Sequence, residues 1–499
     1  MEVIDNLIYG FSISFLPANL LFCFIGVFVG TLVGVLPGLG PAATITMLLP
    51  LTYRLGSPVS ALIMLAGIYY GAQYGGSTTS ILVNIPGEAT SVVTCLDGYQ
   101  MAKKGRAGPA LGIAAFGSFI SGTIAVIGLM LVAPTLARFA LKFGPPEYFG
   151  LMFFTFTIVS YIASGSMIRA FIMVAIGLLL GSVGMDIMTG RYRFTYGILT
   201  LVDGLGLVPV VMGLYGISEV LLNVEEKIIR SVYETKIKGL LPNRQDWKKS
   251  IGPMSRGSII GFFLGLLPGG GPIIASFMSY IVEKRISKHP GQFGHGAIEG
   301  VAAPESANNS AAVAAFIPML SLGIPATANM AIMLGALLMY GVQPGPLLIK
   351  EAPDIFWGTV TSMYTGNIIL LVLNLPLIPI WVKVLRVPYV ILFPLILLFC
   401  VTGAYSINNN ISDIIVMNIF GVVGYFFRKF DFEAAPLVLA YILGPLFEKS
   451  LRQSLIMSDG SFLIFLTRPI TLGFLIVTTI VLITSLIFKK GPEMIFEEK

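Results

Sequence analysis

Two short runs of small polar residues interrupt a chain that is otherwise strongly apolar. The first run is G-G-S-T-T-S at residues 75–80, and the second is P-E-S-A-N-N-S at residues 304–310. Their hydroxyl and amide groups bind carboxylates as donors, or Na⁺ as oxygen acceptors. A single Ser or Thr among apolar residues is more often a helix–helix contact. Because runs of this kind occur in both halves of the chain, we interpret them as binding residues.

A second motif, P-G-x-G-P, also occurs twice, each time after an apolar run with Gly at every fourth position. The two copies span residues 26–41 and 257–272 and match at one constant offset, from Gly26 on Gly257 to Pro41 on Pro272. Glycine at this spacing is typical of closely packed membrane helices. The Pro-Gly motif that follows stops a helix, and broken backbone at membrane depth is tolerated only inside protein or around an aqueous cavity. The pair therefore predicts a transport site.

The composition sets the fold class. The 499 residues are 56% hydrophobic and 11% charged, against about 25% charged residues in soluble domains. The apolar runs are long and uniform, which favours spanning helices over the alternating segments of a barrel. We predict an all-α polytopic membrane protein with two internal repeats, discontinuous helices and re-entrant hairpins. The net charge of +6 is interpreted as membrane topology, with no nucleic-acid partner.

Enzymatic chemistry finds little support in the sequence. The three cysteines are isolated, and the only two histidines, His289 and His295, lie in a polar loop. No phosphate-binding loop, H-E-x-x-H or G-x-S-x-G motif occurs. We therefore predict that the chain is not an enzyme and needs no cofactor, with bound Na⁺ as a coupling ion the one exception considered.

The chain divides into four predicted parts. These are a first membrane repeat at 1–222, a charged, cytoplasmic linker at 223–256, a second membrane repeat at 257–455, and an extra transmembrane helix with a tail at 456–499. A helix is expected from Pro58 to about Gln73, where it meets the first polar run. The offset of the Pro-Gly motifs also places Gly75–Thr79 opposite Ser306–Ser310 without a gap, and an insertion of about eight residues then aligns Ile85-Pro86 with Ile324-Pro325.

Secondary transporters commonly bind substrate where two broken helices meet, because a helix N-terminus binds a carboxylate without a buried Lys or Arg. The predicted substrate-binding residues are Pro37, Gly38, Gly40, Ser77, Thr78, Thr79, Gly269, Gly270, Gly271, Asn308, Asn309, Ser310 and Thr327. The predicted ion-coupling residues are Glu305, Asn84, Asn329 and Ser306. An acid at membrane depth is a functional hypothesis by default, and Glu305 ranks above Glu88 and Glu299 because it directly precedes the Asn-rich run.

At these motifs the sequence resembles the large membrane subunit of the tripartite tricarboxylate transporter family. The matching segments are residues 30–41, 69–88, 265–272, 300–310 and 323–327. The resemblance implies a translocating permease that works with a periplasmic solute-binding protein and a small four-helix membrane subunit in the bacterial inner (cytoplasmic) membrane. It also implies uptake of citrate-like di- or tricarboxylates driven by an ion gradient. By similarity to other binding-protein-dependent secondary carriers, it further implies a secondary transporter with inverted repeats and an elevator-like architecture.

Several alternatives stay open from the sequence. A self-sufficient carboxylate carrier or channel without partner subunits is the alternative function. The sequence does not decide between H⁺ and Na⁺ as the coupling ion, and it does not fix the orientation of the repeats. It also leaves the identity of the carboxylate and the oligomeric state open.

Overall fold

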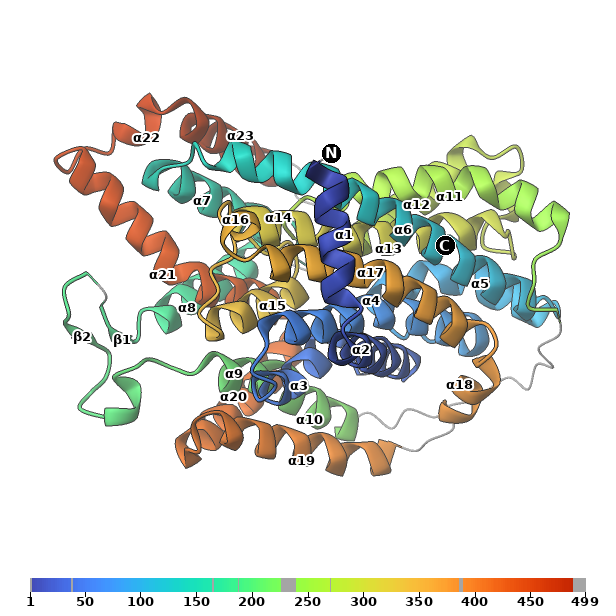
Figure 1. The fold of residues 1–499 in the computed structure, drawn as a ribbon, viewed down its shortest axis with the longest axis horizontal. Helices are drawn as coiled ribbons and strands as arrows, with labels where there is room; N and C mark the ends of the chain where they lie inside the picture. Colours follow the sequence, from blue (N-terminus) through green and yellow to red (C-terminus); the bar gives the residue numbers. More distant parts are fainter. Residues whose placement is uncertain are drawn as a thin grey trace.

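The computed structural model describes residues 2–36, 39–163, 166–186, 188–225, 239–269, 271–385 and 389–487. Within these ranges the chain is helical, apart from one pair of two-residue strands (Figure 1). Six helical segments are long and apolar enough to cross a membrane: Pro17–Val35, Ala107–Ala140, Leu207–Glu225, Pro353–Asn374, Ile411–Lys429 and Ala434–Met457. The prediction of an all-α polytopic membrane protein is confirmed at this level.

The first half begins with a hairpin of two helices and a long helix packed against it. After α1 (Glu2–Ser14), this unit consists of α2 (Pro17–Val35), α3 (Pro41–Tyr53) and α4 (Pro58–Val83). The break between α2 and α3 falls at the first P-G-x-G-P motif, as predicted, although Pro37 and Gly38 lie outside the described residues. We call α2–α4 the first hairpin unit.

The second half contains a corresponding arrangement. The second hairpin unit consists of α11 (Arg244–Gly265), α12 (Gly271–Ile286), α13 (Glu299–Ala314) and α14 (Phe316–Leu322). Its break again falls at the P-G-x-G-P motif, of which Gly270 lies outside the described residues. Helix α11 begins at Arg244, so the last third of the predicted linker is already helical, with Asn243 capping the helix through the backbone N–H of Asp246 at 2.8 Å.

Glycine ridges pack the helices of both units in the same way. In the first unit, a Cβ on Gly26, Gly30 or Gly34 would lie 2.2–2.4 Å from a backbone carbonyl oxygen of α4. In the second unit, a Cβ on Gly257, Gly261 or Gly265 would lie 2.1–2.4 Å from a carbonyl oxygen of α13. The backbones are thus in contact at positions where no other residue fits, which is the reason for the four-residue spacing in the sequence.

This packing corrects the predicted alignment of the polar runs. Gly34 faces Ala72, whereas its counterpart Gly265 faces Ala311. The difference in residue number between Ala72 and Ala311 is therefore eight larger than the difference between Gly34 and Gly265. The eight extra residues lie in the connection before α13, since residues 54–57 join α3 to α4 but residues 287–298 join α12 to α13. The gapless alignment placed the insertion too late because loop residues carry no periodic signal. We call the pairing of Ala72 with Ala311 the corrected alignment.

The polar runs also differ from their predicted structure. Helix α4 continues through residues 75–80 and ends at Val83, and α13 contains residues 304–310 as helix. Small side chains allow this because they bond within or between helices, for example Ser77 Oγ to the carbonyl oxygen of Gln73 at 3.2 Å. The breaks lie further along, where Asn84 and Gly323 take left-handed conformations with φ of 60° and 71°.

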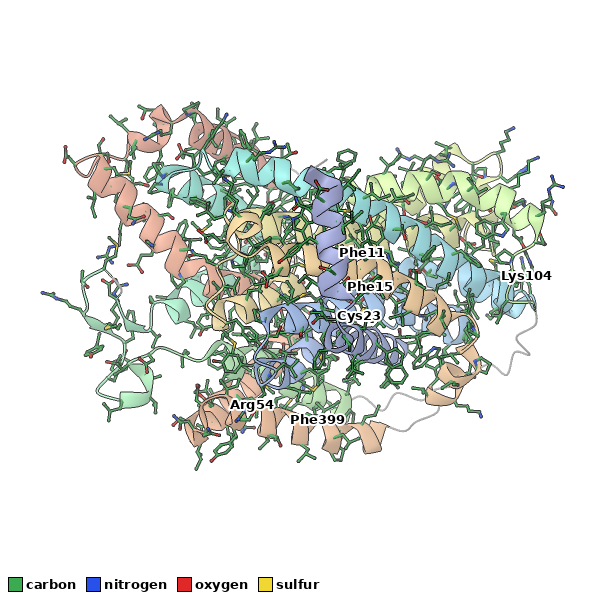
Figure 2. The ribbon with its side chains drawn as sticks, viewed as in Figure 1. Phe11, Phe15, Cys23, Arg54, Lys104 and Phe399 are labelled. Carbon is green, nitrogen blue, oxygen red and sulfur yellow. The ribbon has the colours of Figure 1, made fainter. Side chains whose placement is uncertain are left out.

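The two hairpin units open toward opposite ends of α17 (Pro353–Asn374). Helix α4 runs parallel to α17, since Gly358 adjoins Val59 and Gly366 adjoins Tyr70. The α3–α4 connection therefore lies at the start of α17. Helix α6 (Ala107–Ala140) runs antiparallel to α17, and the α12–α13 connection contacts Lys104, just before α6 begins. Figure 2 shows Arg54 and Lys104, which mark the two connections, well apart.

A new helix begins in each half after the left-handed residue that ends α4 or α14. In the first half, 3₁₀-helix η1 (Ala89–Ser91) leads into α5 (Val92–Lys103). In the second half, Thr327 caps α15 (Ala328–Met339) by accepting a hydrogen bond from the backbone N–H of Met330 at 3.3 Å. In the corrected alignment, the cap residue Thr327 corresponds to Glu88, which precedes η1.

The remaining helices surround these units and include the predicted extra helix near the C-terminus. They are α7 (Pro145–Ile162), α8 (Met167–Gly181), α9 (Leu207–Val211), the π-helix η3 (Met212–Ile217), α10 (Ser218–Glu225), η4 (Pro290–Gln292), α16 (Leu348–Glu351), α18 (Ile378–Val384), α19 (Tyr389–Asn408), α20 (Ile411–Lys429), α21 (Ala434–Met457), α22 (Ile464–Thr467) and α23 (Pro469–Ile487). Helix α8 packs on α21 through Gly177 and Gly181, while α20 packs on η3 through Gly421 and Gly424.

A projecting segment between α8 and α9 carries the two strands, β1 (Gly184–Met185) and β2 (Tyr192–Arg193), and the short helix η2 (Leu199–Leu201) (Figure 1). Asp186 anchors it to α21. Hydrogen bonds from the Thr189 hydroxyl and from the guanidinium groups of Arg452 and Arg193 hold the pKa of Asp186 well below its usual range. The anchor therefore stays charged at neutral pH.

Candidate functional site

A cavity of about 220 Å³ lies where the second hairpin tip meets the breaks of both halves. Gly269 and Pro272 contribute the tip, and the segment 326–329 contributes the start of α15. The first half contributes the segment 88–90 and two residues of α4, Tyr69 and Gln73. Helices α7 and α21 close the remaining sides with mostly apolar residues. Small-molecule sites are typically concave and apolar with a few convergent polar groups, and this cavity has that character.

Backbone polarity at the cavity favours an anion. The first backbone N–H groups of a helix have no partner within it and carry partial positive charge. Helix α15 begins at the cavity with Ala328 and Asn329, and the start of α12 contributes Pro272 and Ile273. The hairpin tip is fixed to the segment before α15 by a hydrogen bond of 2.8 Å from Gly269 N–H to the carbonyl oxygen of Ala326. Two helix N-termini are thus held beside one space.

Two acidic side chains line the cavity. Glu88 and Glu433 line it, and no Lys, Arg or His does so within the described part of the chain. The Thr90 hydroxyl links Glu88 to Gln73, with its oxygen 3.3 Å from Glu88 Oε2 and 2.6 Å from Gln73 Oε1. Asn329 Oδ1 is buried without a hydrogen-bond partner among the described residues. An anionic ligand in this space would therefore meet no basic side chain among the described lining residues.

A second polar region lies apart from the cavity, between α4, α5 and α13. Glu305 has no exposed surface, and its carboxylate accepts hydrogen bonds from the hydroxyls of Ser77 and Thr94. Asn309 donates to Ser118 Oγ of α6 at 2.7 Å and to the carbonyl oxygen of Glu305 at 3.0 Å. We call these residues, with Thr78 and the neighbouring Tyr74, the buried polar cluster. It joins residues from both halves of the chain.

The structure brings only some of the predicted site residues together. Gly269, Thr327 and Asn329 line the cavity, whereas Ser77, Thr78, Glu305 and Asn309 belong to the buried polar cluster. The second hairpin tip and the polar runs thus lie in two different places. The reason is that the runs are helical and face other helices, while the tips lie at the helix breaks.

Other predicted residues contact neighbouring helices. Thr79 donates to the carbonyl oxygen of Val35 at 2.7 Å, and Ser310 donates to that of Ser258 at 2.7 Å. These bonds tie α4 to α2 and α13 to α11, the role that small polar residues commonly have in membranes. The other predicted residues that the structure describes neither line the cavity nor form a hydrogen bond between helices.

Ser306 Oγ and Asn308 Nδ2 are buried without partners among the described residues. Gly271 is buried at the start of α12, Gly40 precedes α3, and Asn84 is exposed after α4. Pro37, Gly38 and Gly270 lie outside the described residues.

Sequence reasoning missed several polar partners. Thr94 lies in α5, just before a polar stretch of the sequence, and it contacts Glu305 from there. Ser118 and Asn374 are single polar residues in apolar spans, and both line a small void beside Ser77. The available signal was the isolated amide of Asn374 in the run I-I-L-L-V-L-N-L-P-L. Spacing alone could not reveal which helix it faces.

Comparison with known proteins identifies the family. The sequence matches the profile of the tripartite tricarboxylate transporter TctA family over residues 20–439. The chain belongs to this family. It is therefore a multi-pass membrane protein of a transporter family, and the resemblance noted in the motifs is confirmed.

Two relatives of this TctA-family protein come from Agrobacterium vitis. One is described as an uncharacterized 52.8 kDa protein in the TAR-I ttuC' 3' region, and it is 50% identical over 502 residues, covering all of both chains. The other, an uncharacterized protein in the TAR-II ttuC' 3' region, is 49% identical over 241 residues, which is 48% of this chain and all of that relative. No solved structure matched the chain.

Proposed function

We propose that this chain is the large translocating subunit of a binding-protein-dependent secondary transporter that takes up organic di- or tricarboxylates. The family membership supports the tripartite assembly, with a periplasmic solute-binding protein and a small membrane subunit as partners in the bacterial inner membrane. The observation that carries the substrate class is the cavity of about 220 Å³ between two helix N-termini. Such termini bind carboxylates through backbone N–H groups.

The composition of the cavity lining supports coupling to a cation. The lining includes two acids, Glu88 and Glu433, and no Lys, Arg or His of the described part of the chain. Protons or Na⁺ that enter together with a carboxylate would supply the positive charge that the lining lacks. We therefore propose symport driven by an ion gradient.

An inverted-repeat, elevator-like architecture is part of the proposal. Three features support it: the matching glycine ridges of α2 and α11, the gap-free corrected alignment from α4 to the break before η1, and the opposite directions in which the hairpin units open. In this arrangement the substrate moves together with the hairpin tips, past helices that stay fixed in the membrane.

The test is uptake by the complete complex in proteoliposomes, with labelled citrate and with C4 dicarboxylates, and with Na⁺ and H⁺ gradients imposed separately. Asn329→Ala removes a cavity amide, and we expect it to raise KM at least several-fold. Asn418→Ala is the matched control, because Asn418 is exposed and bonds only within its own helix. Equal uptake by both variants contradicts the cavity as the substrate site. Uptake by the chain without its partners would favour the alternative of a self-sufficient carrier.

A further inference from the structure

Glu305 lacks a counter-charge. The carboxylate is fully buried within α13, and no ion pair in the described part of the chain includes it. Its two bonds come from neutral hydroxyls, those of Ser77 and Thr94. A buried carboxylate with neutral partners alone is costly, so this region favours the arrival of one positive charge.

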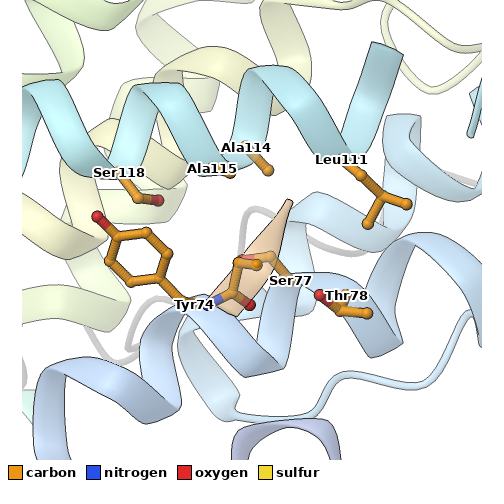
Figure 3. A pocket seen from close by; sticks show the side chains of 8 residues that line it. Tyr74, Ser77, Thr78, Leu111, Ala114, Ala115 and Ser118 are labelled. Atoms are coloured by element: carbon orange, nitrogen blue, oxygen red, sulfur yellow. The ribbon is translucent and has the colours of Figure 1, made fainter. Parts of the chain in front are cut away.

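A small void lies directly beside this carboxylate's partner Ser77. Its volume of about 10 Å³ corresponds to about one water molecule. Helix α4 lines it on one side and α6 on the other, with Tyr74 near Ser118 (Figure 3). The lining residues are Tyr74, Ser77, Thr78, Leu111, Ala114, Ala115, Ser118 and Asn374.

The polar atoms around the void include oxygens with unused lone pairs. The hydroxyl hydrogen of Ser77 is committed to Glu305 or to the carbonyl of Gln73. Asn374 donates through Nδ2 to the carbonyl oxygen of Leu370 at 3.0 Å, which leaves Oδ1 buried without a partner. The Tyr74 oxygen is also buried without a partner among the described residues. These atoms offer lone pairs, which are the ligands of a hard cation.

We propose that this void binds one dehydrated Na⁺, with oxygens of Ser77, Asn374 and neighbouring hydroxyls as ligands and Glu305 as the counter-charge. A monovalent ion matches a single buried carboxylate, whereas a divalent ion would leave a net buried charge. The volume fits an ion as small as Na⁺ without its hydration shell. The inference rests on the proposed function, because this ion would be the coupling ion. It would bind apart from the carboxylate cavity, although residues of α4 line both places.

The experiment measures ion binding without transport. The purified full chain is heated in detergent at increasing NaCl, with KCl and choline chloride keeping the ionic strength constant. A ligand that binds only the folded state raises Tm with its concentration. We expect Tm to rise with NaCl and to stay level when K⁺ or choline replaces Na⁺. Equal Tm values in the three salts overturn the proposal. That result is expected if the void holds only water or if a proton neutralises Glu305.

Variants locate the effect. Asn374→Ala and Glu305→Gln should each remove the Na⁺-dependent rise in Tm. Ser121→Ala is the matched control, because Ser121 is buried on α6 and bonds to the carbonyl oxygen of Ser118 without lining the void. If Glu305→Gln does not fold, Asn374→Ala and Ser118→Ala decide the question, and a retained Na⁺ response in both overturns the site.

The outcome is separable from that of the proposed function. A Na⁺ response with no carboxylate uptake by the complex keeps the ion site and contradicts the transport proposal. Uptake driven by a pH gradient, together with no Na⁺ response, keeps the transport proposal and overturns the ion site.

Discussion

The two hairpin units share their backbone packing but not their polar chemistry. In both units, glycines at every fourth position place one helix against the carbonyl oxygens of the next. At the helix ends the residues differ, since Asn84 corresponds to Gly323 and Glu88 to Thr327. The acid within the helix differs too, because Ala66 stands at the position that corresponds to Glu305. Symmetry is therefore kept where backbones touch and lost where a ligand or ion could bind.

This difference indicates how two similarly packed hairpin units can act asymmetrically. The glycine contacts leave no space for a side chain, so both units retain the same residues there. At the cavity, Glu88 and its counterpart Thr327 both line the space, so each half supplies a different group there. The described cavity takes Glu88 from the first half, and Glu433 and the capped helix α15 from the second.

The largest expected effect comes from the shared glycines. Gly30→Ala places a Cβ 2.4 Å from a backbone carbonyl oxygen of α4, and Gly261→Ala places one 2.1 Å from a backbone carbonyl oxygen of α13. Backbone cannot move away as a flexible side chain would, so we expect each to cost about 3 kcal/mol or more of stability. Tm and the yield of monodisperse protein measure this loss. Gly473→Ala is the control, because its Cβ meets nothing within 4 Å. A loss for only one of the two glycine variants would break the equivalence of the units.

The glycine ridges also show which parts of the fold the sequence could predict. Spacing identified α2 and α11, and Pro-Gly motifs identified both hairpin breaks, because these constraints act locally on the backbone. The eight extra residues of the connection at 287–298 were misplaced, since a loop has no period. The partners of Glu305 were missed for another reason: Thr94 lies 211 residues away, and only the fold brings the two together.

The longer connection gives the next prediction. Asp97 is buried in α5 and accepts bonds from the backbone N–H groups of Gly294 (2.9 Å), Gly296 (2.7 Å) and Ala297 (2.8 Å), and from the Tyr280 hydroxyl (2.9 Å). Asp97→Ala leaves these donors without an acceptor, at a cost of about 1–3 kcal/mol for each donor that water does not reach. We expect a lower Tm and faster hydrogen exchange in residues 287–298.

The first unit provides the internal control for this variant. Its connection at 54–57 has no contact with Asp97, so its exchange should stay unchanged. Asp203→Ala, at an exposed position, should leave both connections unchanged. Equal exchange in residues 287–298 of Asp97→Ala and the unaltered protein would mean that the carboxylate does not hold this loop.

The smallest expected effect concerns the two left-handed residues that end α4 and α14. Gly323 has a φ of 71°, and a Cβ there would lie 2.7 Å from the carbonyl oxygen of Pro344, so Gly323→Asn should cost about 1–2 kcal/mol. Asn84 is exposed with a φ of 60°, and Asn84→Gly should change stability by less than about 0.5 kcal/mol because Gly adopts this conformation freely. Tm and uptake by the reconstituted complex measure both variants. A stable Asn84→Gly protein with altered Na⁺ or H⁺ dependence of uptake would show that Asn84 does more than end a helix, which is the ion-coupling role predicted from the sequence.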